Sequence, residues 1–292
     1  MNGRAFLALG LAGLCWGLGF PLGKVVLRET DAAHLVLLRF AVAAAAALPF
    51  VLVRKDTRAL FRSWPVLLSG VLYGAAFVIQ FEGLARVNVS LAALLIGLMP
   101  ALVAVCARFL GEPIDRSAWA GVAAATLGAA LIAGKPEGAG TPLGIALSLS
   151  ALLVFLAWLF VLKKAPPSPT TLAIPGVMMV VAALTILPVA LVMDGAPKLD
   201  LSPAAWAATV GQGLLSTFLA TAAWQYGSTR VSSASAGVFI NVEPVMGAVL
   251  GVVLFGERLG WPLIVGGVLV LGGSLVVVLN ERPAPPAPPT PA

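Results

Sequence analysis

The sequence predicts an all-α integral membrane protein of ten transmembrane helices, arranged as two inverted five-helix repeats. Of the 292 residues, 60% are apolar and 10% are charged, whereas a soluble domain is about 45–50% apolar and about 25% charged. The mean hydropathy of +1.02 reflects apolar sequence along nearly the whole chain. No soluble fold of this size can bury so much apolar surface, so the chain needs lipid as its solvent.

Ten apolar segments, each bounded by charges, proline or glycine, are long enough to cross the hydrocarbon core as helices. Together they leave no room for a soluble domain, so the function must lie in the membrane part. We expect the helices at residues 4–24, 32–53, 65–85, 88–109, 117–134, 143–162, 171–193, 204–228, 232–254 and 261–279.

The positions of lysine and arginine predict the orientation, because these residues collect on the cytoplasmic side of a membrane. With the N-terminus inside, eleven of them lie in inner segments and six in outer segments, with Arg39 left inside a helix. We therefore expect both termini in the cytoplasm and the protein in the cell inner (plasma) membrane. The inner residues are Arg4, Arg54, Lys55, Arg58, Arg62, Arg108, Arg116, Lys163, Lys164, Arg230 and Arg282, and the outer ones are Lys24, Arg28, Arg86, Lys135, Lys198 and Arg258.

The net charge of +6 comes from residues that stand singly or in small groups between apolar runs. This pattern favours the lipid bilayer, and not nucleic acid, as a partner. Cys15 and Cys106 each lie in an apolar run without a neighbouring histidine or second cysteine. His34 is the only histidine and is expected in or near an outer loop, so neither a metal cluster nor a histidine-based triad can be assembled. We expect no metal, no cofactor and no enzyme activity.

The chain repeats itself at an interval of about 144 residues. Each copy spans five helices, and this odd number forces the second copy to enter the membrane from the opposite face. We expect the first repeat at 1–135, the inverted second repeat at 143–280 and a disordered Pro-rich tail at 281–292. Inverted repeats are typical of secondary transporters, which bind solute between the halves near the midplane. The matched residues are Gly83 with Gly227, Arg86 with Arg230, Pro100 with Pro244, and Gly111-Glu112 with Gly256-Glu257.

Several features follow one another along the chain: the Trp16-Gly17 pair and Pro21 in the first helix, Arg39 in the second, Pro100 and Pro244 in the fourth and ninth, and the Gly-Glu pairs that end those two helices. This ordered set resembles the drug/metabolite transporter superfamily, in its EamA group of ten-helix exporters. The resemblance covers nearly the whole chain. It implies a central cavity and the export of small metabolites such as amino acids, or of drug-like compounds, without identifying the substrate.

Glu243 is expected near the middle of the ninth helix, where a charge costs about 2.5–3.5 kcal/mol and needs a partner or a role. Its counterpart in the first repeat is Met99 and that of Asn241 is Gly97, so the fold requires neither side chain. We expect Glu243 to face the cavity as a proton acceptor or as the countercharge of an amine, with Asn241 as a substrate ligand. The structural alternative pairs this carboxyl with Arg39 or with a backbone group at a proline kink.

Arg39 and Glu82 are further candidates for coupling or gating. Arg39 either binds a substrate carboxylate or locks the second helix to its neighbours through carbonyls and a carboxylate, and we favour the lock. Glu82 is expected near the outer end of the third helix, where it is either an interfacial carboxylate in reach of water or a gate.

Aromatic and polar side chains at helical spacing predict the lining of a small-molecule pocket, because aromatic walls bury the apolar parts of a solute while polar tips orient it. For each aromatic residue the alternative is ordinary helix packing or an interfacial anchor. The expected lining residues are Trp16 and Phe20, then Tyr73, Phe77 and Gln80, then Trp158, and then Thr217, Thr221 and Trp224.

Pro100 and Pro244 each remove a helix hydrogen bond at matched repeat positions, which predicts a shared kink. The kinks act either as opposite gates or as static bends that improve packing.

These features predict a carrier that exports small amphipathic metabolites by alternating access, as a monomer or homodimer. Proton coupling stays open, and so do two other classes of protein. One is a membrane receptor or assembly subunit that keeps the carrier fold without transport, and the other is a passive channel.

Overall fold

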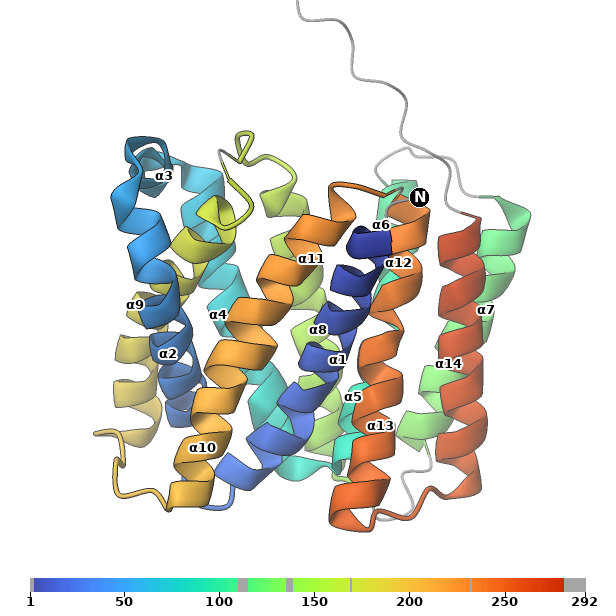
Figure 1. Ribbon diagram of the computed structural model, residues 1–292. Helices are drawn as coiled ribbons and strands as arrows, with labels where there is room; N and C mark the ends of the chain where they lie inside the picture. Colours follow the sequence, from blue (N-terminus) through green and yellow to red (C-terminus); the bar gives the residue numbers. More distant parts are fainter. Residues whose placement is uncertain (1–2, 110–114, 135–138, 169, 232, 281–292) are drawn as a thin grey trace, which may run out of the picture.

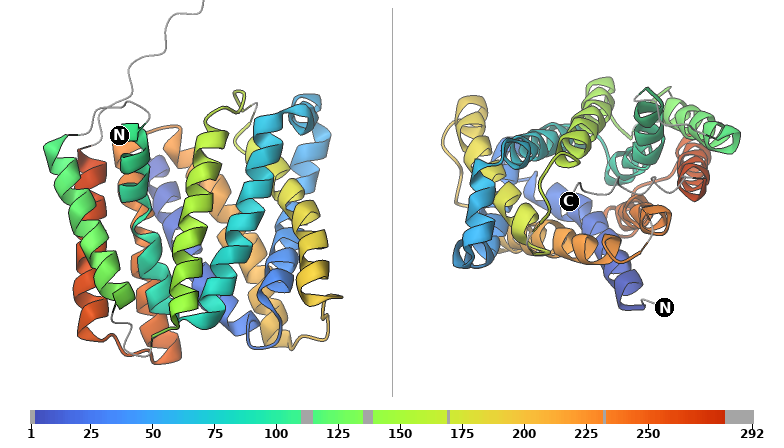
Figure 2. Two further views of the ribbon diagram at one scale, coloured as in Figure 1. Left: turned by 180° about the vertical axis from the view of Figure 1, so that it is seen from behind. Right: turned by 90° about the horizontal axis from the view of Figure 1, so that it is seen from above.

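The computed structural model describes residues 3–109, 115–134, 139–168, 170–231 and 233–280. The Gly111-Glu112 pair, Lys135, Arg282 and the tail at 281–292 lie outside this range. Figures 1 and 2 show helices standing side by side, with the start of α1 and the end of α14 at the same face as α3. The helices are α1 (Gly3–Val26), α2 (Ala32–Val53), α3 (Lys55–Ala59), α4 (Trp64–Arg86), α5 (Val89–Ile96), α6 (Met99–Phe109), α7 (Arg116–Gly134), α8 (Pro142–Leu162), α9 (Ala173–Asp194), α10 (Pro203–Gly211), the π-helix η2 (Gln212–Leu219), α11 (Ala220–Ser228), α12 (Ser233–Ile240), α13 (Val242–Phe255) and α14 (Trp261–Leu279), with a short 3-10 helix η1 at Leu60–Arg62.

Among the described residues, nine helical segments are long and apolar enough to cross a membrane. The expected class, an all-α integral membrane protein, is therefore confirmed. The tenth expected segment, 204–228, is divided among α10, η2 and α11, which follow one another from one face to the other (Figure 1). The short elements α3 and η1 in the basic segment after α2 were not expected from the sequence.

Two helices that were expected to be continuous are interrupted. Residues 88–109 form α5 and α6, and residues 232–254 include α12 and α13. Proline lacks an N–H group, and its ring collides with the carbonyl four residues earlier. Four residues before Pro100 is Ile96, where α5 ends, and four residues before Pro244 is Ile240, where α12 ends. The expected kinks are therefore breaks, and both prolines lie in the first turn of the following helix.

Much of the helix packing is the same when the two halves are exchanged. The contact between α4 and α8 corresponds to that between α1 and the segment from α10 to α11, and the contact between α4 and α9 corresponds to that between α2 and η2. The contacts of α2 with α9, of α5 with α13 and of α7 with α14 join corresponding spans, whereas the large contact of α1 with α13 has no equally large counterpart between α8 and α5 or α6. Figure 1 shows corresponding helices running in opposite directions, since α1 runs away from the α3 face and α8 runs towards it.

The face opposite α3 carries a carboxylate that caps a helix of the other half. Glu29, in the turn between α1 and α2, accepts hydrogen bonds from the backbone N–H of Ser202 at 2.7 Å and from its hydroxyl at 2.6 Å. The Ser202 hydrogen bonds hold the pKa of the Glu29 carboxyl below its ordinary value. The turn after α1 is thereby fastened to the start of α10.

Glycines allow α7 and α14 to approach until their backbones touch. A Cβ atom at Gly128 would lie 2.5 Å from the Gly266 carbonyl oxygen and 2.8 Å from the Val270 backbone nitrogen. Backbone atoms cannot turn aside as a flexible side chain can, so only glycine fits at this contact.

We predict that Gly128→Ala lowers the free energy of unfolding by about 1–3 kcal/mol, the usual cost of overpacking. The matched control is Gly272→Ala, which also lies in a helix but where a Cβ would meet no atom within 4 Å. The control should be neutral or stabilising, because alanine has the higher helix propensity. Thermal unfolding of both variants in detergent measures the difference, and equal shifts would contradict the packing argument.

Candidate functional site

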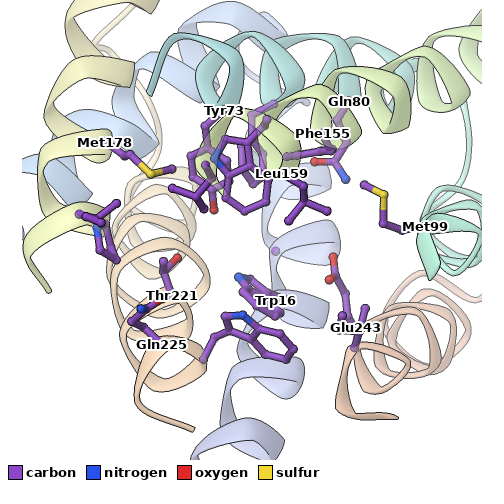
Figure 3. Close-up of a pocket in the computed structure, with 18 of the residues that line it drawn as sticks. Trp16, Tyr73, Gln80, Met99, Phe155, Leu159, Met178, Thr221, Gln225 and Glu243 are labelled. Atoms are coloured by element: carbon purple, nitrogen blue, oxygen red, sulfur yellow. The ribbon is translucent and has the colours of Figure 1, made fainter. Parts of the chain in front are cut away.

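A cavity of about 520 Å³ lies between the two halves of the chain. This volume falls within the range of about 300–1,000 Å³ that small-molecule pockets occupy. Its walls come from α1, α2, α4, α8, α9, α11 and α13, with the ends of α5, α6 and α12. Of the residues expected from the sequence, it is lined by Trp16, Phe20, Arg39, Tyr73, Phe77, Gln80, Trp158, Thr221, Trp224 and Glu243 (Figure 3).

One wall of the cavity is an aromatic cluster on α4 and α8. The Tyr73 ring centroid lies 4.9 Å from that of Phe77 and 5.0 Å from that of Trp158. Phe155 closes the cluster, with its ring 5.2 Å from Phe77 at an interplanar angle of 89°. Edge-to-face contacts of this kind stabilise aromatic pairs beyond the area they bury. The wall is therefore a preformed apolar surface.

The facing wall comes from α1 and α11. These helices are the counterparts of α8 and α4 in the opposite halves of the chain. Trp16 and Trp224 lie with ring centroids 5.3 Å apart, and Figure 3 shows Trp16 below the α4 and α8 cluster with the cavity between them. A flat apolar group placed in the cavity would therefore meet aromatic rings on two sides.

Glu243 is the acidic residue among those that line the cavity. Figure 3 shows its carboxylate directed into the space between Trp16, Met99 and Leu159. Within the described part of the chain, no hydrogen bond or ion pair reaches this carboxylate, and the recorded ion pairs lie elsewhere. A carboxyl group at membrane depth without a protein partner is costly, so such groups usually mark a solute or proton site.

Two further lining residues have hydrogen-bonding capacity that the protein leaves unused. The Gln80 Oε1 and Trp158 Nε1 atoms are buried and have no hydrogen-bond partner among the described residues. Buried polar groups in proteins are nearly always paired, so each exception needs an explanation. A polar solute in the cavity would supply the missing partners.

Arg39 is 2% exposed and lies at the edge of the cavity. Its Nε donates to the Thr217 hydroxyl at 2.5 Å and its Nη2 donates to the Ser216 carbonyl at 3.2 Å. Its guanidinium carbon also lies 4.2 Å from the centre of the Phe77 ring, a cation–π distance. These contacts hold α2 against η2 and α4, as a lock would, although no carboxylate pairs with Arg39 among the described residues.

The π-helix supplies the acceptor for Arg39. The Thr217 hydroxyl donates to the Gln212 carbonyl at 2.9 Å, five residues earlier. A π segment widens the helix locally and leaves carbonyls free for partners other than the helix itself. Thr217 therefore lies behind the cavity wall as a ligand of Arg39 and not in the lining, where the spacing had placed it.

Four other expected site residues do not line the cavity. Asn241 lies in the break between α12 and α13, and both polar atoms of its amide are buried without a hydrogen-bond partner in the described part of the chain. Glu82 forms an ion pair with Arg86 at 2.5 Å, one helical turn away at the end of α4. Pro100 and Pro244 flank the two helix breaks. Their neighbours Met99, Ile240 and Glu243 line the cavity instead.

The cavity is accessible from the α3 face. Its lining extends to Lys163 and Pro166 in the α8–α9 connection, both of them exposed. At the other face, the Lys24 Nζ donates to the carbonyls of Leu84 at 2.8 Å and Val87 at 2.7 Å. Lys24 was counted as a loop charge from the sequence, but it lies in the last turn of α1 and caps the end of α4.

Glu257 makes the complementary cap on the same turn between α4 and α5. Its Oε1 accepts from the Val89 backbone N–H at 2.7 Å, and its Oε2 accepts from the Ser90 N–H at 2.8 Å and the Ser90 hydroxyl at 2.6 Å. A carboxylate at a helix N-terminus is favourable because it neutralises the positive end of the helix dipole. Lys24 and Glu257 therefore fasten α1 and α13 to α4 and α5 at this face.

Three features of the site were not expected from the sequence: the Phe155 ring in the lining, the cap by Lys24 and the partners of Glu257. Phe155 lies three residues before Trp158 on α8, so helical spacing could have added it to the lining. The Gly-Glu pair was noted as a recurring motif, but its capping bonds join residues 168 positions apart, which no local pattern reveals.

The fold and the site define a multi-pass membrane protein with a cavity of solute size between two similar halves. The model of the EamA-like transporter family matches residues 3–134 and again residues 142–279. The chain belongs to this family, which confirms the resemblance found in the sequence. Its relatives are named as transporters or permeases and not as enzymes.

Three relatives illustrate the range of similarity. A protein of Streptantibioticus cattleyicolor named "Probable terminal-alkyne amino-acid exporter" is 31% identical over 96% of this chain and 94% of its own length. An uncharacterized transporter of Archaeoglobus fulgidus is 26% identical over 94% and 99% of the two chains. The Bacillus subtilis permease-like protein YdzE is 35% identical over 24% of this chain and 90% of its own.

A solved crystal structure has the same fold. It superposes with a TM-score of 0.66 at 21% sequence identity, covering 94% of this chain and 96% of that one. At this identity the similarity bears on the fold alone.

We predict that Glu257→Gln lowers the free energy of unfolding by about 1.5–3 kcal/mol, the usual contribution of hydrogen bonds to a charged group. Glutamine keeps one carbonyl oxygen but turns an amide donor towards N–H groups that need an acceptor. The control is Asp56→Asn, whose exposed pair with Arg54 at 3.3 Å should contribute about 1 kcal/mol or less. Unfolding of both variants in detergent checks the prediction, and similar losses would show that the cap adds nothing.

Proposed function

We propose that the protein is a secondary transporter that exports small amphipathic metabolites, amino acids or related amines among them, by alternating access. The observation that carries the proposal is the unpaired Glu243 carboxylate in a cavity of about 520 Å³ between aromatic walls. A carboxylate attracts a substrate ammonium group, while aromatic rings bury an apolar side chain. The name of the Streptantibioticus relative supports this substrate class.

The two inverted repeats, with the boundaries 1–135 and 143–280, form part of the proposal. Three observations support them: the two family matches, the opposite directions of corresponding helices, and the breaks after Ile96 and Ile240 at matched positions. In such folds the site lies where the repeats meet, and rocking of one half against the other exposes it alternately.

Glu243 would act as the coupling residue. When ionised it binds the substrate ammonium, and when protonated it is neutral and releases it, so proton and substrate compete for one carboxylate. Gln80 and Thr221 would bind the polar groups of the substrate that Glu243 leaves free. Arg39 would position α2 and η2 at the cavity edge, and its two hydrogen bonds to η2 leave its Nη1 for a substrate carboxylate.

Access to the cavity would alternate between the α3 face and the face opposite it. In this structure Lys24 and Glu257 hold that face closed, while Lys163 and Pro166 border the open side. The breaks before Pro100 and Pro244 would let α6 and α12 move relative to α5 and α13. Glu82 with Arg86 lies at the closed face and would act as a gate there. Asn241 lies at one break and would bind the substrate as it passes.

The α3 face would be cytoplasmic, since α3 and its surroundings carry Arg54, Lys55, Arg58 and Arg62. Both termini would then be cytoplasmic, in the inner membrane of the cell. The oligomeric state, a monomer or a homodimer, remains a prediction.

We predict that Glu243→Gln reduces solute counterflow at least 10-fold and removes its dependence on pH, because the variant keeps the shape of the side chain but neither ionises nor carries a proton. Purified protein in proteoliposomes is assayed with radiolabelled neutral and cationic amino acids. The control is Asp56→Asn, which removes an exposed carboxylate paired with Arg54 outside the cavity and should stay within about 2-fold of wild type.

Two results would contradict the proposal. If Glu243→Gln matched wild type in rate and pH response, the carboxylate would have no role in transport. If the wild type showed no counterflow with any solute of the panel, a receptor or assembly subunit that keeps the fold would be the better assignment, and flux without saturation would favour a channel.

A further inference from the structure

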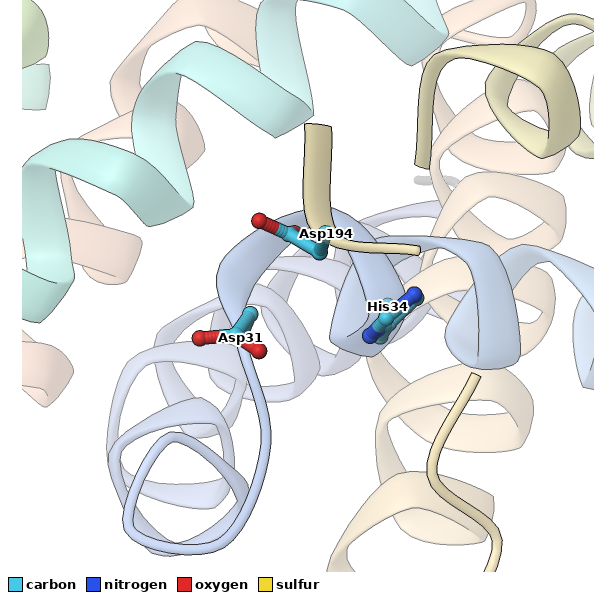
Figure 4. A group of neighbouring side chains, drawn as sticks. All are labelled: Asp31, His34 and Asp194. Atoms are coloured by element: carbon cyan, nitrogen blue, oxygen red, sulfur yellow. The ribbon is translucent and has the colours of Figure 1, made fainter. Parts of the chain in front are cut away.

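Three side chains that can bind a metal meet at the face opposite α3, away from the cavity. Asp31 precedes α2, His34 lies in its first turn, and Asp194 is the last residue of α9 (Figure 4). Each offers one ligand atom, and the three atoms lie within 4.8 Å of one another. This distance is short enough for a single ion to contact all three after small side-chain rotations.

His34 is fully buried, with 0% of its surface exposed, and one of its ring nitrogens has no hydrogen-bond partner within the ranges that the structure describes. Its Nε2 lies 3.0 Å from the Gly195 carbonyl oxygen. A carbonyl can only accept, so Nε2 carries a hydrogen, and Nδ1 is the ring nitrogen that can bind a metal. Histidine ligands of metals are commonly oriented in this way, by donating the other N–H to a carbonyl or carboxylate.

Among the described residues, neither the buried Nδ1 atom of His34 nor the buried Oδ2 atom of Asp194 has a hydrogen-bond partner. Each unpaired buried group costs about 1–3 kcal/mol, so a cation that accepts both lone pairs explains why they are retained together.

Asp31 completes the set from the solvent side. It occupies the N-cap position of α2, yet its carboxylate makes no capping hydrogen bond, and its side chain is exposed. The neighbouring Glu29 is engaged with Ser202 and does not compete for this role. Neither Asp31 nor Asp194 forms an ion pair with another described residue. The cluster thus combines two carboxylates, an imidazole and a path to water.

We propose that Asp31, His34 and Asp194 bind a divalent transition-metal ion, of which Zn²⁺ is the probe. One imidazole nitrogen and two carboxylate oxygens are ligands that zinc accepts, whereas Mg²⁺ and Ca²⁺ are bound by oxygen ligands alone. Water on the exposed side of Asp31 would fill the fourth position. The bound ion fastens the start of α2 to the end of α9, the two helices that pack together across the halves.

The proposal differs from the expectation drawn from the sequence, in which a single histidine argued against a metal site. The fold brings Asp194 to His34 from 160 residues away, and two carboxylates replace the further histidines that a sequence motif would require. The inference does not depend on what the cavity transports.

The test is metal binding to the full-length protein in detergent, without an affinity tag and after treatment with a chelator. Titration with Co²⁺ followed by visible absorption, then displacement by Zn²⁺, gives the stoichiometry and the affinity. We expect one equivalent per chain in the wild type. Asp31→Asn should weaken the affinity at least 10-fold, and because Asp31 is exposed and caps nothing, this variant should fold normally.

The matched control is Asp56→Asn, a substitution of an exposed aspartate at the other face, which should bind as the wild type does. Zn²⁺ should also raise the unfolding temperature of the wild type and of Asp56→Asn but not of Asp31→Asn or His34→Gln, because a ligand of the native state stabilises it. The proposal is overturned if the wild type binds less than half an equivalent, or if Asp31→Asn binds as tightly as the control. Either result would leave a metal-free contact between His34 and the two carboxylates.

Discussion

Backbone polar groups at membrane depth need partners within the protein, and this constraint shapes the whole site. Lipid offers no hydrogen bonds, so a helix can be interrupted only where side chains or a water-filled space replace the lost partners. The Gly97 carbonyl, at the break between α5 and α6, accepts from the Ser274 hydroxyl. The Ser216 carbonyl in η2 accepts from Arg39, and the Gly19 carbonyl in α1 accepts from Gln212 at 2.5 Å.

These irregular points surround the cavity, which explains why the chain tolerates them there. Ile96, Met99 and Ile240 flank the two breaks and line the cavity, while η2 lies behind its wall through Arg39. Regular helices such as α7 and α14 lie further out and pack through glycines instead. The helices around the cavity thus depart from ideal geometry. A solute in the cavity would meet backbone polar groups that the helix breaks leave without helical partners.

The two halves share a packing pattern but not a chemistry. Glu243 lies in the second half at the position that Met99 occupies in the first, and both line the cavity. The aromatic walls likewise come from corresponding helix pairs with different residues, Tyr73 and Trp158 on one side and Trp16 and Trp224 on the other. A symmetric scaffold therefore carries an asymmetric site, as a solute with one charged end and one apolar end requires.

The sequence predicted what depends on local pattern. Hydropathy placed nine spans within a few residues, Pro100 and Pro244 marked the interruptions, and helical spacing found most of the aromatic lining. It placed Thr217 in the lining because spacing ignores the π-helix, which turns that hydroxyl towards Arg39. The caps by Lys24 and Glu257 and the meeting of His34 with Asp194 join distant residues, and only the packed helices create them.

The central claim is that Glu243 faces a cavity open at the α3 face, and thiol accessibility tests it most directly. Glu243→Cys is made with Cys15→Ala and Cys106→Ala, and a membrane-impermeant thiol reagent is added to either side of sealed vesicles. We predict reaction from the α3 side at least 10-fold faster than for Val245→Cys, whose side chain is 46% exposed on the outside of the helix bundle. Equal, slow reaction at both positions would contradict the account, because it would place the Glu243 side chain in lipid or in a closed core.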